Sequence, residues 1–188
     1  MMRIKFLLLV TVAGFLPVLA GAQNNPLFST RNGSISIRSD APLELIEAAS
    51  GELKGVIDVS KKTFSFSIQN RSFKGFNSPL QQEHFYENYI EANKFPSSSF
   101  KGKIIEQVDL TTDGNYQVRA KGLLFIHGVE QERIIKVDVK VKNGVIQASS
   151  AFTVPLSDHN ITIPKIVYQK IAEEVNVTVN ASFTPENK

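Results

Sequence analysis

The sequence contains no cysteine, which excludes disulfide bonds and metal sites built on thiolates. Stability must therefore come from the burial of apolar side chains and from strand pairing. The apolar run near the beginning of the sequence is not followed by a cysteine either. Attachment of a lipid anchor by that route is excluded too.

Sequence motifs of several large enzyme classes are missing as well. There is no G-x-S-x-G nucleophile elbow, no phosphate-binding glycine loop and no dinucleotide-binding fingerprint. Asp158 and His159 are adjacent, but without the elbow they do not indicate a serine hydrolase. We expect a protein that is not an enzyme and that carries no cofactor.

The chain also lacks an excess of charge of one sign. It has 21 basic and 18 acidic residues, a net charge of +3. Without Arg3 and Lys5, which lie in a predicted signal peptide, 19 basic residues stand against the same 18 acidic ones, and the two signs are interspersed. A nucleic-acid-binding protein usually shows a basic patch or stripe, so we expect no nucleic-acid partner.

The first 22 residues have the layout of a secretory signal peptide: basic Met1–Lys5, apolar Phe6–Ala20, and a small-x-small site that ends at Ala22. The apolar run of about 15 residues is shorter than the roughly 20 that a membrane-spanning helix needs. We therefore expect export to the periplasm, cleavage near Ala22 and no stable membrane insertion afterwards. Residues 23–188 are long enough for one domain with a sizeable core.

What the sequence has in abundance is alternation of apolar and polar side chains with a period of two. Phe64, Phe66 and Ile68, for example, alternate with Thr63, Ser65 and Ser67. About eight such segments occur, and Asn143-Gly144 is a strong hairpin signal between two of them. This pattern predicts an antiparallel all-β fold, either a sandwich or a closed barrel. Periodicity alone does not choose between them.

The segment Ser72–Ile105 interrupts the alternation and holds seven of the seventeen aromatic residues. Ser78-Pro79 has the form of a helix N-cap followed by proline at the first helical position. The helix that follows would show Glu83, Glu87 and Glu91 on one face and aromatic side chains on the other. Those aromatics could either pack a core or line a pocket. A second short helix is predicted at Pro164–Ala172.

Three histidines, His84, His127 and His159, could in principle form a metal site, because three imidazoles suffice for a catalytic zinc. They are far apart in the sequence and lack the short spacing of a ligand motif. We therefore predict no metal site.

Small side chains at positions predicted to face inwards favour a hollow barrel over a filled one. An eight-stranded barrel is just wide enough to hold one small ligand, and small inward residues leave room that bulky ones would fill. The inward positions concerned are Gly102, Ala120, Gly122, Ala148, Ser150 and Ala181.

Several blocks, in order through almost the whole mature chain, resemble the YceI-like family of periplasmic lipid-binding proteins. They are Ser34–Arg38, Ala48–Phe66, the block from His84-Phe85 through Phe95-Pro96 to Phe100-Lys101-Gly102, Gly122–Val129, and Phe152–Ile163. The resemblance implies an extended, lipocalin-like antiparallel barrel with a long apolar cavity for a polyisoprenoid or another long-chain lipid. The chain departs from the family pattern at Asp158-His159-Asn160, where many members have an aromatic residue and glycine after the aspartate.

We accordingly predict a barrel of about eight strands, with one or two short helices, that binds a polyisoprenoid or fatty-acyl chain. Eleven side chains would line its interior: Phe64, Phe66, Ile68, Phe100, Ile104, Tyr116, Val118, Val137, Val139, Ala148 and Phe152. Phe73, Phe76, Phe85 and Tyr89 would cover it, with His84, His127 or Asp158 near a polar headgroup.

Two alternatives stay open: an interaction module with a filled core, and a histidine-based metal-dependent hydrolase. Whether the protein forms a homodimer is also left open.

Overall fold

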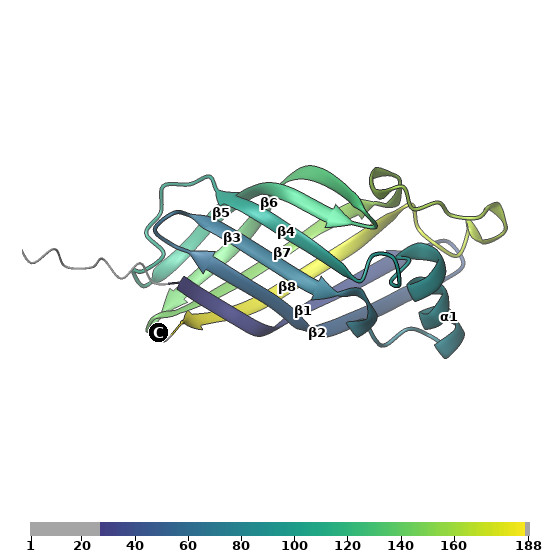
Figure 1. Ribbon diagram of the computed structural model, residues 1–188, viewed down its shortest axis with the longest axis horizontal. Coiled ribbons are helices and arrows are strands. Elements are labelled where there is room, and N and C mark those ends of the chain that lie inside the picture. The colour runs from purple at the N-terminus through teal and green to yellow at the C-terminus, as the bar shows by residue number, and fades with distance from the viewer. Residues whose placement is uncertain (1–26, 187–188) are drawn as a thin grey trace, which may run out of the picture.

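Eight antiparallel strands form a closed barrel in the computed structural model, which describes residues 27–186 (Figure 1). The strands are β1 (Leu27–Asp40), β2 (Leu45–Asp58), β3 (Thr63–Gln69), β4 (Ser97–Ile104), β5 (Gly114–Ile126), β6 (Val129–Lys142), β7 (Val145–Pro155) and β8 (Glu174–Pro185). The predicted all-β barrel is confirmed. The predicted signal peptide, residues 1–22, lies outside the described residues.

The barrel follows from the period-two pattern, because alternate side chains of a strand point to opposite faces of the sheet. Each strand pairs with its neighbours in the sequence, and β8 pairs with β1 to close the ring. The hairpin at Asn143-Gly144 has positive φ at both residues (53° and 73°), as the sequence signal predicts. Apolar side chains therefore face the interior and polar ones face solvent.

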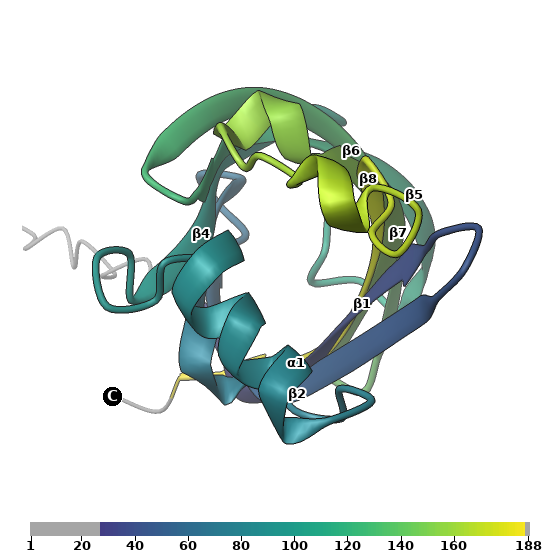
Figure 2. The ribbon, with the colours of Figure 1, turned by 90° about the vertical axis from the view of Figure 1, so that its right-hand side faces the viewer.

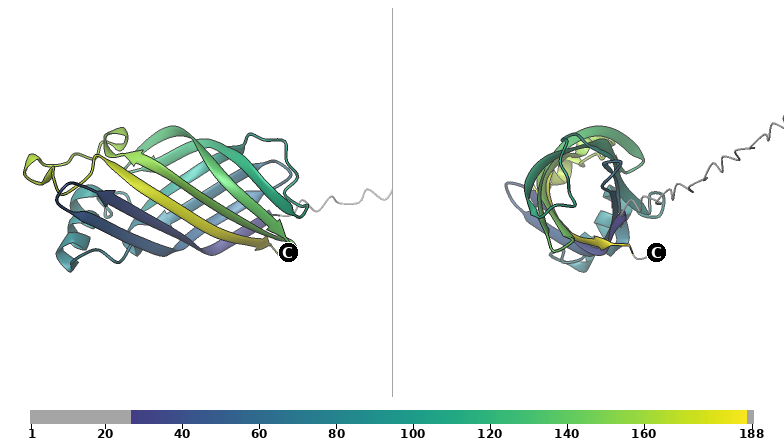
Figure 3. Two further views of the ribbon diagram at one scale, coloured as in Figure 1. Left: turned by 180° about the vertical axis from the view of Figure 1, so that it is seen from behind. Right: turned by 90° about the vertical axis from the view of Figure 1, so that its left-hand side faces the viewer.

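One end of the barrel is closed by packed side chains. Leu110, in the connection between β4 and β5, is buried against a cluster that includes Phe64, Ile146 and Phe183. Both ends of the described chain also lie at this end (Figure 3). We refer to it as the closed end.

The opposite end carries the helical elements. They are η1 (Asn70–Ser72), α1 (Pro79–His84), its π-helical continuation η2 (Phe85–Tyr89), and two 3₁₀ turns, η3 (Leu156–His159) and η4 (Lys165–Val167). Viewed along the barrel axis, α1 and η2 lie across the barrel end from the segment 156–172 (Figure 2). We refer to this as the helical end.

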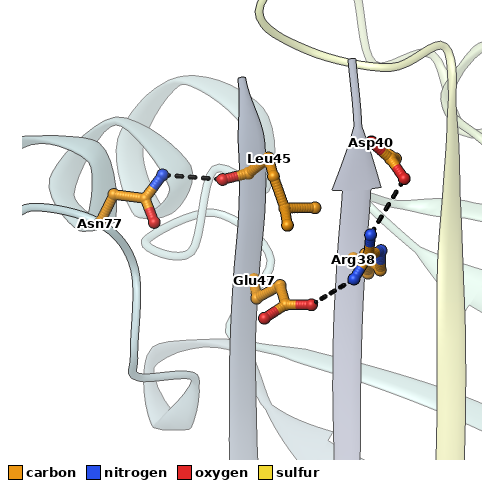
Figure 4. A network of polar contacts seen from close by, with 5 residues as sticks. All are labelled: Arg38, Asp40, Leu45, Glu47 and Asn77. Carbon is orange, nitrogen blue, oxygen red and sulfur yellow. Dashed lines mark hydrogen bonds and ion pairs between the residues drawn. The ribbon is translucent and has the colours of Figure 1, made fainter. Parts of the chain in front are cut away.

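Polar contacts fix the start of α1 and attach it to the barrel. The Ser78 side chain accepts a hydrogen bond from Gln81 N, which confirms the predicted N-cap. The Asn77 side chain donates to Leu45 O at 2.8 Å, beside the ion pairs that Arg38 forms with Asp40 and Glu47 on β1 and β2 (Figure 4). The helix start is therefore held against the first hairpin.

The second predicted helix, Pro164–Ala172, is wrong in extent. The structure has only the single turn η4, with i→i+3 bonds from Val167 N to Pro164 O and from Lys170 N to Val167 O. Two contacts to the β1–β2 region take the place of further helical bonds: Leu43 N donates to Gln169 O, and Ala172 N donates to Ser39 Oγ. Tertiary hydrogen bonding overrides the local helix pattern.

A close approach of two strands in the wall predicts a position that is sensitive to substitution. Gly102 on β4 faces Gly122 on β5, and a Cβ added at Gly122 would overlap the carbonyl oxygen of Lys101. We expect Gly122→Ala to lower the free energy of unfolding by about 1–3 kcal/mol, because the backbone must shift to relieve the overlap. Gly51→Ala is the matched control, since a Cβ there meets nothing within 4 Å. Urea unfolding of both variants checks this, and equal stabilities would contradict it.

Candidate functional site: an apolar cavity in the barrel

The barrel interior contains a cavity of about 230 Å³ with walls that are almost entirely apolar. Inward side chains next to it, such as Phe66, Phe100, Phe152 and Val179, are only partly buried although they point into the barrel. Inward-pointing residues of a filled barrel would be fully buried, as Ile146 is at the closed end. The interior is therefore packed at one end and hollow towards the other.

Most of the predicted interior residues line this cavity. Twelve of the eighteen predicted site residues do so: Phe64, Phe66, Ile68, Phe73, Phe85, Phe100, Ile104, Val118, Val137, Val139, Ala148 and Phe152. Four of the six small inward residues, Ala120, Ala148, Ser150 and Ala181, also border it. Whether any of these side chains contacts a ligand stays a prediction.

Sequence reasoning missed the contribution of β1, β2 and β8. Ile35, Ile37, Leu53, Val177 and Val179 line the cavity from these strands. The same period-two alternation runs through all three segments. The signal was therefore present, and these residues could have been included.

The other six predicted residues lie elsewhere. Tyr116 packs near the closed end, and its hydroxyl donates to Thr112 O at 2.9 Å. Phe76, His84 and Tyr89 border a second hollow at the helical end. His127 and Asp158 lie at the helical end too and form polar contacts with other parts of the protein.

The second hollow, called the outer pocket below, lies between α1–η2, the ends of β1 and β2, and the segment that contains η4. It has a volume of about 340 Å³. Ile37, Phe85 and Val175 line both the outer pocket and the cavity. Unlike the cavity, the outer pocket has acidic and basic residues in its wall, including Glu44, His84 and Lys170. Its composition suits a polar group at the end of an apolar chain.

His127 links three elements at the helical end. Its Nδ1 lies 2.9 Å from His159 O, and since a carbonyl oxygen can only accept a hydrogen bond, Nδ1 is the donor. Its Nε2 lies 2.6 Å from Glu91 Oε2. His127 and Glu91 both have positive φ, 50° and 44°. Glu91 was predicted to continue the acidic outer face of the helix. It instead turns towards His127, since the helix ends at Tyr89.

His159 is fully buried and serves the packing of η3. Its Nδ1 lies 3.3 Å from Val129 O, while its Nε2 has no hydrogen-bond partner among residues 27–186. Burial lowers the pKa of this imidazole. Within the part of the chain that the structure describes, no group of three or more His, Asp or Glu side chains is arranged to hold a metal ion.

Asp158 belongs to a seam in the barrel wall between β6 and β7. The backbone ladder between these strands covers only Asp138–Lys142 and Val145–Ser149. Beyond it, side chains bridge the two strands: Ser150 Oγ donates to Lys136 O and Arg133 donates to Thr153 O, both at 2.6 Å. Gln131 of β6 donates to Asp158 O of η3 at 2.7 Å. The Asp158 carboxylate lies 3.4 Å from Arg133. It therefore has a structural partner already.

No helix among residues 27–186 combines the length and apolar character needed to cross a bilayer.

Comparison with known proteins gives one family and several related folds. The profile of the YceI-like domain matches residues 28–183. A polyisoprenoid-binding domain from Saccharophagus degradans, implicated in plant cell wall breakdown, has a TM-score of 0.71 at 12% identity, covering 85% of this chain and 98% of its own. BcnA of Burkholderia cenocepacia has a TM-score of 0.67 at 16% identity (80% and 95% covered). The Campylobacter jejuni YceI protein has a TM-score of 0.55 at 16% identity, covering 98% of this chain and 100% of its own. No curated protein matches the chain.

The buried imidazole of His159 predicts a pH dependence of stability. Its pKa in the folded protein lies below the ordinary value of about 6.5. Between these two pKa values the unfolded chain binds a proton that the folded protein does not, so stability falls as the pH drops through about 6.5. We expect His159→Gln to reduce the slope of the unfolding free energy against pH by up to about 1 kcal/mol per pH unit.

Urea unfolding between pH 5 and 7.5 measures this slope. His84→Gln removes an exposed histidine on α1 and is the matched control. If His159→Gln and the wild type show the same slope, burial of His159 does not govern the acid sensitivity.

Proposed function

Because the chain belongs to the YceI-like family, we propose that it binds one long-chain lipid, a polyisoprenoid or a fatty-acyl chain, inside the barrel and catalyses no reaction. The observation that carries this proposal is the apolar cavity, walled by side chains of all eight strands. Such a wall offers neither hydrogen bonds nor charge, so it selects for a ligand segment that needs none.

Burial of apolar surface provides the binding energy. Each methylene group moved from water into the cavity contributes about 0.8 kcal/mol. A chain of several isoprene units or a dozen methylenes therefore gains enough to offset the loss of translational freedom and of chain flexibility. No catalytic group is needed for this role. The narrow, elongated shape of an eight-stranded barrel suits one chain rather than a compact molecule.

One structural relative supports the same chemistry. The Saccharophagus degradans domain is described as polyisoprenoid-binding, and its barrel covers most of this chain. At 12% identity its side chains need not coincide with those of this protein. The likeness supports an apolar chain as the ligand class rather than a particular lipid.

We further propose that residues 1–22 direct export and are removed, so that residues 23–188 carry or store the lipid in the periplasm. Determination of the N-terminal residue of the exported protein tests this. A mature protein that begins near Gln23 is expected; a chain that retains residues 1–22 would argue against cleavage.

Native mass spectrometry of the freshly purified protein tests lipid binding directly. We expect a mass increment equal to one lipid, released by organic extraction and restored by incubation with a polyprenol or a fatty acid. Repeated absence of a co-purified lipid, together with no uptake of either compound, would contradict the proposal.

A cavity-filling substitution gives a sharper test. Val179 on β8 points into the hollow part of the barrel, whereas its neighbour Thr178 faces solvent. We expect Val179→Phe to lower lipid occupancy at least about tenfold, because the ring takes space that the chain requires. Thr178→Phe adds the same ring outside and should bind normally. Equal occupancy of both variants would mean that the lipid does not lie beside Val179.

A further inference from the structure

The four most exposed large apolar side chains of residues 27–186 all lie at the helical end. They are Ile166, Leu43, Leu80 and Tyr168, which are 92%, 67%, 65% and 64% exposed. Leu80 belongs to α1, Leu43 to the β1–β2 turn, and the other two to the segment 164–172. We call these four residues the apolar rim. Single exposed apolar residues are ordinary, but a group at one end of a molecule marks an interaction site.

Hydrogen bonds hold the rim in place. Leu43 N donates to Gln169 O at 2.9 Å, and Ala172 N donates to Ser39 Oγ at 2.9 Å. The turn that carries Ile166 has its own bond from Val167 N to Pro164 O. Figure 1 shows this segment, in yellow-green, projecting past the barrel at the same end as α1. The apolar side chains are thus presented outwards by an ordered turn.

The charges around the rim indicate its orientation. Lys165 and Lys170 are exposed on either side of Ile166 and Tyr168, and residues 164–172 contain no acidic residue. The next two residues, Glu173 and Glu174, are exposed where the chain enters β8. The exposed glutamates Glu83 and Glu87 belong instead to α1 and η2. An anionic surface would therefore attract the segment 164–172 and repel the outer side of the helix.

The rim also borders the route into the barrel. Leu80, Val167 and Lys170 line the outer pocket. Phe85 lines both the outer pocket and the cavity, as Ile37 and Val175 do, so the hollow at the rim and the apolar interior share a wall. A chain that left a bilayer at the rim would cross the outer pocket before it entered the barrel.

We propose that the apolar rim docks on the surface of an anionic phospholipid bilayer, and that the outer pocket is the passage through which the lipid chain enters the barrel. Ile166 and Leu43 insert among the acyl chains, Tyr168 lies at headgroup depth, and the two lysines contact phosphates. This inference rests on the proposed lipid-binding function. A projecting turn with apolar tips suits a bilayer better than a protein partner, which needs a broad complementary surface.

Flotation of the mature protein with vesicles tests the docking surface. The vesicles contain phosphatidylcholine alone, or phosphatidylcholine with a quarter phosphatidylglycerol. We expect binding to the anionic vesicles, reduced about tenfold by the double variant Ile166→Ser/Tyr168→Ser and to a similar degree by Lys165→Glu/Lys170→Glu.

The barrel wall offers matched controls. Ile134 is 55% exposed on β6, away from the rim, so Ile134→Ser should leave vesicle binding unchanged. Lys136→Glu/Lys140→Glu makes the same charge change on exposed positions of β6 and should reduce binding far less than the rim variant.

Transfer of a fluorescent polyprenol from vesicles to the protein gives the second readout. The rim variants should slow transfer about tenfold, while native mass spectrometry finds them fully loaded after long incubation with the polyprenol. A protein that is loaded with lipid but ignores vesicles overturns the docking proposal and leaves the binding function intact. Vesicle binding without any lipid uptake overturns the binding function instead.

If the rim variants change only the oligomeric state or the capture of another protein, the rim is a protein interface and the membrane proposal is wrong.

Discussion

The pairing of β8 with β1 is the constraint on which the rest of the structure depends. It closes the sheet, and closure removes the exposed edges that an open eight-stranded sheet would present. It also fixes the register, so that every second side chain of each strand must face the interior. Whether that interior is solid or hollow then depends only on the sizes of these side chains and on what covers the two ends.

The two ends of the barrel are covered in different ways. At the closed end, Leu110 reaches in from a loop and packs in one apolar cluster with Ile146 and Phe183. At the helical end, the cover is assembled from separate segments held by polar contacts, such as that between His127 and Glu91. The closed end is therefore covered by apolar packing. The cover at the helical end combines aromatic packing, such as that of Phe73 against Phe85, with individual polar contacts.

Much of the fold can be predicted from the sequence, because period-two alternation is a local signal that tertiary contacts reinforce. The Ser78 cap is local as well, since its acceptor and its donor are three residues apart. The turn of Glu91 towards His127 could not be predicted, because it depends on positive φ at two residues 36 positions apart. The short η4 turn was mistaken for a helix because its partners, Leu43 and Ser39, are distant in the sequence.

The same reasoning explains how well the site was predicted. Residues on strands with clear alternation, such as Phe64 and Phe100, line the cavity as expected. Those at the helical end, such as His84 and Asp158, were assigned by their polarity alone, and polarity does not reveal a partner. Asp158 is already paired with Arg133.

The barrel wall is more easily deformed along the seam between β6 and β7 than along a complete ladder. The backbone hydrogen bonds of a ladder fix the spacing of two strands, because the strands can separate only if those bonds break. The long side chain of Arg133 can instead follow a change in spacing by rotating about its own bonds while it remains hydrogen-bonded to Thr153 O. The spacing of β6 and β7 beyond their short ladder is therefore less rigidly fixed than that of two strands joined along their whole length.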